Sequence, residues 1–192
     1  MTVAAEGVTQ NYEASFEQED AALDLIASDH VLSRLLAYWC SKSGPDRLPS
    51  RRDIDPSEIP DLLPHLLMIE VGESGSFRCR LSGSAVAAGY GRELAGKSFV
   101  EAFAADAAAR AALNCRRVAA LGRPLIVHNT YAEAKGKGLA ASCLLLPLAD
   151  SKGVVGRILA GMRAHSRAQS PAPFDRPLIA SRRYVARLHA DA

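Results

Sequence analysis

Three apolar runs in the second half of the chain, separated by short polar turns, most restrict what this sequence can fold into. The runs cover 124–131, 139–148 and 154–162. Glycine and polar residues fill 135–138 and 150–153, a composition typical of hairpin turns. We therefore predict three consecutive strands that form an antiparallel meander.

The last of these runs has two unlike faces. Ile158, Ala160 and Met162 fall on one face, while Leu159 falls on the other face together with arginines. Strand side chains alternate between the two faces of a sheet, so both faces of this strand need apolar cover. We expect an amphipathic helix to cover Leu159.

A helix is predicted over 30–42, where apolar residues recur three and four positions apart. Ser28 or Asp29 would cap its start. Its apolar stripe, together with Leu159, is the candidate face for a dimer or partner, and the residues are Leu32, Leu35, Leu36, Trp39 and Leu159.

The middle of the chain completes a mixed α+β pattern. A β-hairpin is expected over 66–71 and 77–81, because apolar and polar residues alternate on both sides of a glycine turn. Short helical patterns follow over 85–90, and an alanine-rich helix is expected over 106–121.

The two ends differ in charge from this core. Residues 1–28 form an acidic leader that we expect to be partly disordered. The core domain, with its N-terminal helix, is placed at 29–165. Residues 166–192 are predicted to hold a proline-containing linker and then a helix over 177–189 that carries arginines.

Composition excludes several classes of protein. The formal net charge of +2 is too small to indicate a nucleic-acid partner. No apolar run is long enough to span a membrane, and no secretory signal is visible, so we expect no membrane insertion and a cytoplasmic location. The four cysteines lack the spacing of a zinc site or a disulfide framework, and no metal site is expected.

Several segments carry a resemblance to a known family. They are LAYW at 36–39, LPSR at 48–51, RLSGS at 80–84, GRELAG at 91–96 and LLPL at 145–148. These segments resemble a proteobacterial family of short, stand-alone PAS-like proteins. The resemblance implies a five-stranded antiparallel sheet, helices that enclose a pocket on its inner face, and the amphipathic N-terminal helix on its outer face.

The resemblance also implies a function. Most PAS domains sense a signal or mediate contacts, and 192 residues leave no room for an output domain. We therefore expect a non-enzymatic regulatory module, a homodimer, that acts in trans on a separate signalling protein under the control of a small molecule. Two alternatives stay open: a dimeric adaptor with a filled core and no ligand, and a haem-binding or enzymatic PAS-like protein.

Candidate pocket residues are the bulky, polarisable or polar side chains expected near the inner face, namely Tyr90, Phe99, Phe103, His128, Cys143 and Met162. His128 could ligate haem iron or bind a ligand, although a lone histidine is more often structural. The segment 114–117 resembles the photoactive cysteine motif of light-sensing PAS proteins, but an arginine replaces its aromatic residue. No cofactor is predicted, and no catalytic motif is present.

Overall fold

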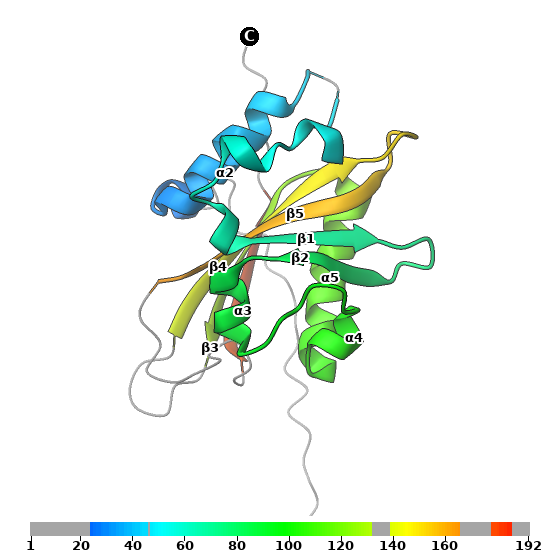
Figure 1. The fold of residues 1–192 in the computed structure, drawn as a ribbon. Helices are drawn as coiled ribbons and strands as arrows, with labels where there is room; N and C mark the ends of the chain where they lie inside the picture. Colours follow the sequence, from blue (N-terminus) through cyan, green and yellow to red (C-terminus); the bar gives the residue numbers. More distant parts are fainter. Residues whose placement is uncertain (1–23, 46, 132–138, 166–177, 186–192) are drawn as a thin grey trace, which may run out of the picture.

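The computed structural model describes residues 24–45, 47–131, 139–165 and 178–185 (Figure 1). Most of the predicted acidic leader, the predicted linker and the turn at 135–138 lie outside the described residues.

The described strands form one antiparallel sheet in the order β2-β1-β5-β4-β3-β6. Their bounds are β1 Leu66–Val71, β2 Phe77–Ser82, β3 Leu125–Tyr131, β4 Leu139–Ala149, β5 Val155–Ala164 and β6 Leu178–Val185. The predicted hairpin and the predicted meander are both present as β1–β2 and β3–β4–β5. The α+β fold class is confirmed, and the sheet has one strand more than the five expected.

The extra strand corrects the predicted C-terminal helix. Residues Leu178–Val185 are extended and pair antiparallel with β3, where Asn129 lies opposite Ser181. Without this strand, β3 would leave a row of backbone N–H and C=O groups unpaired at the edge of the sheet. Pairing with β3 satisfies those groups, and so tertiary context decides the structure of this segment.

Helices lie on both faces of the sheet (Figure 1). Helix α2, His30–Lys42, packs on β4 and β5 from the outer face. Helices α3 Ser84–Tyr90, α4 Phe99–Ala102 and α5 Ala105–Leu121 belong to the inner side, where α5 contacts β4 and β5. Three short 3-10 helices, η1 Arg51–Asp53, η2 Pro56–Glu58 and η3 Leu63–His65, connect α2 to the sheet.

The outer core is formed by α2 and the outward side chains of the sheet. Its members include all five residues assigned to the partner face, Leu32, Leu35, Leu36, Trp39 and Leu159, and none is more than 8% exposed. The indole of Trp39 also donates a hydrogen bond of 2.9 Å to the carbonyl of Pro147 in β4. The structure therefore corrects this assignment: the apolar stripe covers the chain's own sheet and is not free for a second chain.

Asp29 fixes the start of α2. One of its carboxylate oxygens accepts hydrogen bonds from the amides of Val31 and Leu32, which caps the helix. The other lies 3.1 Å from Nε of Arg163 on β5. Burial raises the pKa of Asp29, but the bonds from Leu32 and Arg163 outweigh burial, and the net pKa is lowered. The carboxylate thus joins the helix to the sheet.

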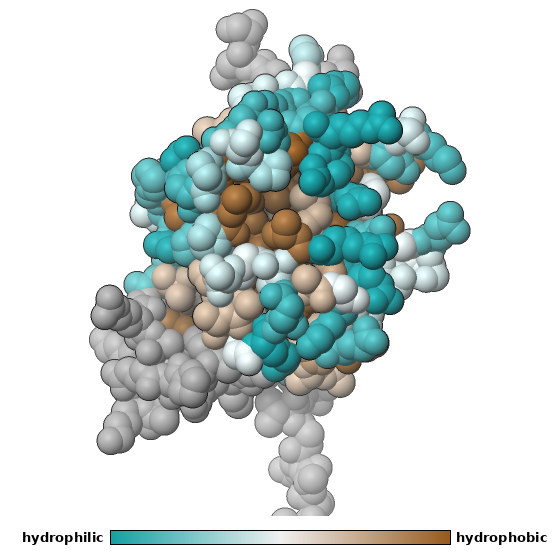
Figure 2. All heavy atoms as spheres, viewed as in Figure 1, coloured by the Kyte–Doolittle hydropathy of each residue, from teal (hydrophilic) through white to brown (hydrophobic). Residues whose placement is uncertain are grey.

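A β-bulge in β2 changes which face of the sheet its side chains occupy. Met68 lies opposite Leu81 and Ile69 opposite Cys79, so Arg80 is the extra residue. The bulge takes Leu81 out of the inward alternation of Phe77 and Cys79, and its side chain is 40% exposed. Arg80 instead contacts Glu70 at 2.6 Å. In Figure 2, apolar residues gather near the middle of the visible face, and hydrophilic residues surround them.

The start of α3 depends on a close approach between backbones. A Cβ atom on Gly83 would lie 2.2 Å from the carbonyl oxygen of Leu63 and 2.4 Å from that of Pro64. These are backbone atoms of η3, which a side-chain rotation cannot move. Glycine at this position lets η3 and α3 pack together.

Candidate ligand pocket

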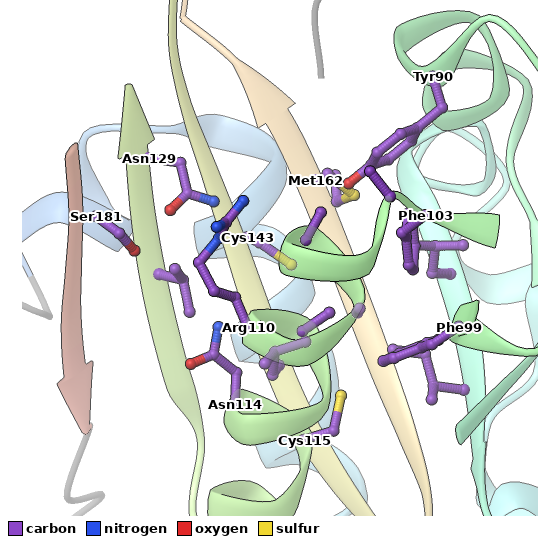
Figure 3. Close-up of a pocket in the computed structure, with 18 of the residues that line it drawn as sticks. Tyr90, Phe99, Phe103, Arg110, Asn114, Cys115, Asn129, Cys143, Met162 and Ser181 are labelled. Carbon is purple, nitrogen blue, oxygen red and sulfur yellow. The ribbon is translucent and has the colours of Figure 1, made fainter. Parts of the chain in front are cut away.

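A cavity of about 310 Å³ lies between the inner face of the sheet and the helices α3, α4 and α5 (Figure 3). This volume is at the small end of the range of about 300–1,000 Å³ found for ligand pockets. Five of the six predicted pocket residues line it: Tyr90, Phe99, Phe103, Cys143 and Met162.

His128, the sixth, lies on the opposite face of the sheet. Its neighbours Val127 and Asn129 line the cavity, and side chains alternate along β3. The imidazole contacts Ser142 Oγ through Nδ1 at 2.9 Å and stacks on His165 with ring centroids 5.4 Å apart. The prediction that His128 faces the pocket is therefore wrong, and from this position it cannot ligate a group bound there.

One end of the cavity is aromatic. The ring of Phe103 lies 5.2 Å from that of Phe99 and 5.2 Å from that of Tyr90, measured between centroids. Phe77 of β2 stacks on Phe99 from behind at 5.4 Å. Such ring pairs have preferred tilted or offset geometries, which fix the shape of this wall.

The loop between α3 and α4 holds the aromatic end in place. Ser98 and Glu101 form a capping box that starts α4, so that Phe99 is the first residue of that helix. The guanidinium of Arg92 donates two hydrogen bonds, of 2.6 and 3.0 Å, to the carbonyl of Ala102. These bonds tie the end of α4 to the loop that follows α3.

The other end of the cavity is polar, and Figure 3 shows its labelled residues on α5, β3 and β6. Arg110 Nη1 lies 2.8 Å from the carboxylate of Asp106, one helical turn earlier on α5. Asn114 Oδ1 accepts a hydrogen bond of 2.7 Å from Nε of the buried Arg183 on β6. Ser181 of the same strand completes this end.

Asn129 contributes an unused hydrogen-bonding group. Its amide nitrogen donates to the hydroxyl of Tyr131 at 3.2 Å. Its Oδ1 is buried and has no hydrogen-bond partner among the described residues. A buried acceptor without a donor costs about 1–3 kcal/mol, so this oxygen is a place where a bound molecule could contribute a stabilising contact.

The thiols at the cavity are not nucleophiles. Burial raises the pKa of Cys143 to about 12 and that of Cys115 well above its ordinary value. Both thiols are therefore protonated at neutral pH, and they serve as apolar lining.

The one serine flanked by imidazoles in the described part of the chain is remote from the cavity. Ser142 Oγ lies 2.9 Å from His128 and 2.7 Å from His165, but Ser142 is 1% exposed and points to the outer face. A substrate cannot reach it there. Across the described ranges, no cluster of three or more metal-ligating side chains is found.

Sequence reasoning missed the polar lining residues, which are Asp106, Arg110, Asn114, Asn129, Tyr131 and Ser181. A signal was present on α5. Asp106, Arg110 and Asn114 recur four residues apart and so share one face of the helix. The abundant alanines of that helix indicate helix propensity, which says nothing about the role of this polar row.

Comparison with known proteins supports the fold. A family model described as "PAS domain" matches residues 28–163. The chain matches none of the curated proteins with which it was compared. Within the described segments, no helix combines the length and the apolar character needed to cross a membrane.

Proposed function

Because the chain belongs to the PAS domain family, we propose that it is a non-enzymatic sensory module whose inner cavity binds a small molecule. In this proposal the module acts in trans through contacts with a separate signalling protein. It does so in the cytoplasm, a location consistent with its four free cysteines.

The cavity carries the proposal. It has an aromatic end, a polar end and the unpartnered oxygen of Asn129, which together resemble a small-molecule site more closely than a packing defect. Ligand sites combine apolar walls with a few convergent polar groups, as this one does.

The C-terminal strand offers a route by which occupancy could alter an outside surface. Ser181 of β6 lines the cavity, and Arg183 of the same strand bonds to the lining residue Asn114. Strand β6 ends the order of strands in the described sheet. A ligand that shifts these contacts would change how firmly this edge strand is held.

The competing functions have less support. An enzyme needs a reactive group at the cavity, and the two thiols there are protonated while Ser142 is buried on the other face. The haem alternative depends on His128 as the axial ligand, and His128 lies across the sheet from the cavity. The adaptor alternative, with a filled core, fits the described structure less well because a cavity remains.

A homodimer remains part of the proposal, but through a different surface. The stripe on α2 is buried, whereas Leu81 on β2 is 40% exposed on the outer face. Light scattering at micromolar concentration should give the mass of two chains, and Leu81→Arg should give the mass of one. A single-chain mass for the unmutated protein would remove dimerisation from the proposal.

The sensor proposal is tested by native mass spectrometry of protein purified from its host and by a thermal shift screen with small metabolites. A ligand should appear as an adduct or raise the melting temperature, because it binds the folded state alone. Ala111→Leu narrows the cavity and should abolish both signals, whereas Ala120→Leu on the exposed face of α5 should preserve them. No adduct and no shift with a broad panel would favour the adaptor.

A further inference from the structure

The charge at the cavity is asymmetric. Among the lining residues that the structure describes, Asp106 and Arg110 carry charge. Their side chains differ in exposure, at 70% for Asp106 and 23% for Arg110. The carboxylate therefore lies at the solvent side and is well screened, while the guanidinium lies deeper, where its charge acts more strongly on a bound group.

The arginine keeps donors for a ligand. The bond to Asp106 uses Nη1, and a guanidinium has five N–H groups in a planar fork. In Figure 3 the guanidinium of Arg110 lies between α5 and the strands, on the same side as Asn129 and Asn114. This is the arrangement that recognises a carboxylate.

Asn114 supports the same chemistry. Its oxygen is occupied by the hydrogen bond from Arg183, and Figure 3 shows its amide nitrogen on the side of Arg110. An amide nitrogen donates hydrogen bonds and suits an anionic acceptor. The positive charge of Arg183, buried behind Asn114, adds to the attraction for an anion at this end.

Asn129 requires a hydrogen-bond donor from the ligand, whereas Arg110 and Asn114 require an acceptor. Its buried Oδ1 is an acceptor without a donor among the described residues, so it would disfavour a bare anion and favour a hydroxyl or an amine. The polar end thus presents donors from Arg110 and Asn114 and one acceptor, Asn129 Oδ1, which Figure 3 shows on the side of Ser181. A carboxylate with a hydrogen-bond donor on the neighbouring carbon satisfies both.

The apolar end of the cavity limits the size and shape of the rest of the ligand. Tyr90, Phe99, Phe103 and Met162 form its walls, and the cavity volume is about 310 Å³. One ring or a short alkyl chain suits a space of this size and shape.

We infer that the pocket binds a small aromatic or apolar carboxylic acid that carries a hydroxyl or amino group beside the acid, with Arg110 as the carboxylate-binding residue. This inference rests on the proposed sensory function and names the ligand class of the same site. The acid contacts Arg110 and Asn114, the neighbouring donor contacts Asn129, and the ring or chain lies against the aromatic walls.

A matched series of probes tests each part by isothermal titration calorimetry. The reference probe is 3-phenyllactate. The second probe, 3-phenylpropionate, lacks the hydroxyl group, and the third, 3-phenylpropionamide, lacks both the hydroxyl group and the negative charge. The fourth, L-phenylalanine, replaces the hydroxyl donor by an amine. We expect 3-phenyllactate or L-phenylalanine to bind best. Removing the donor should weaken binding severalfold, and removing the charge should weaken it by a further factor of about ten or more.

Three variants locate the carboxylate. Arg110→Gln should abolish the preference for the acid over the amide. Asp106→Asn removes the competing carboxylate and should strengthen binding of the acids severalfold. Arg116→Gln removes one positive charge from the exposed face of the same helix and should leave all affinities unchanged.

Equal binding of the amide and the acid, or unchanged acid affinity in Arg110→Gln, would overturn the inference while leaving a ligand-binding pocket in place. So would a failure of all four probes at millimolar concentration. The sensory function is judged separately, because native mass spectrometry of the host-purified protein detects a ligand of any class.

Discussion

Arg183 on the last strand donates a hydrogen bond of 2.7 Å from Nε to Oδ1 of Asn114 on α5. Both residues are buried, and 69 positions separate them in the chain. This contact joins the C-terminal strand to the helix that lines the pocket.

Replacing Arg183 should therefore destabilise the whole domain. Arg183→Met leaves the oxygen of Asn114 buried without its donor, and we expect a loss of about 2–3 kcal/mol in the free energy of unfolding. Urea unfolding followed by circular dichroism measures it. The neighbouring Arg182 is exposed, and Arg182→Met should change stability by less than about 0.5 kcal/mol. Equal effects of the two substitutions would mean that the buried bond contributes little.

Trp39 should combine packing with a specific hydrogen bond. Trp39→Phe removes the donor to the carbonyl of Pro147 and should cost about 1–3 kcal/mol, while Trp39→Ala also empties part of the outer core and should cost about 3–5 kcal/mol. Denaturant midpoints of the two variants separate the contributions. A phenylalanine variant as unstable as the alanine variant would assign the effect to the lost hydrogen bond, and one as stable as the unmutated protein would assign it to volume.

Gly83 should tolerate no side chain. Gly83→Ala places a methyl group 2.2–2.5 Å from backbone atoms of Leu63 and Pro64, so η3 and α3 must separate. We expect a loss of several kcal/mol, or no folded protein, since core overpacking alone costs about 1–3 kcal/mol. At Gly44 an added Cβ meets its nearest neighbour at 3.5 Å, an ordinary contact. Gly44→Ala therefore serves as the control and should remain folded, with a melting temperature near that of the unmutated protein.

His128 on the outer face should make stability depend on pH. Burial, followed by the positive charges of His165 and Arg182, lowers the pKa of His128 from its ordinary 6.5. Below pH 6.5 the unfolded chain then binds this proton more readily than the folded chain. The contribution of His128 to stability should accordingly be constant above that value and fall as the pH drops from about 6.5 through the lowered pKa.

His128→Asn keeps a hydrogen-bonding group beside Ser142 and removes the titration. Its unfolding free energy should therefore fall less between pH 7 and pH 5 than that of the unmutated protein. Denaturant titrations at several pH values within this range measure the difference. Identical pH slopes in the two proteins would show that His128 is not the responsible group.

The strands and helices of the core could be predicted because their signals are local. Alternation in β5 correctly separated Ile158 and Met162 from Leu159, and the spacing of apolar residues correctly placed α2 at His30–Lys42. The apolar stripe of α2 did not reveal what covers it, however. An amphipathic helix looks the same in sequence whether it packs on its own sheet or on a second chain.

The remaining errors have physical causes beyond local pattern. In β3, Leu125, Ile126 and Val127 are all buried, so apolar alternation does not reveal which face His128 occupies. The last strand carries both apolar residues and arginines, a mixture that also suits a helix. The segment forms a strand because it pairs with the otherwise unpaired edge of β3, and sequence periodicity does not indicate that edge.

The last strand is both a wall of the cavity and a margin of the sheet. Free energies of binding at two sites that share one element are coupled, and the coupling is equal in both directions. If a ligand tightens β6 through Ser181 and Asn114, then a partner that grips β6 must raise the affinity of the cavity for that ligand by the same factor. Binding of the partner would then change the cavity through the same contacts by which binding of the ligand changes β6.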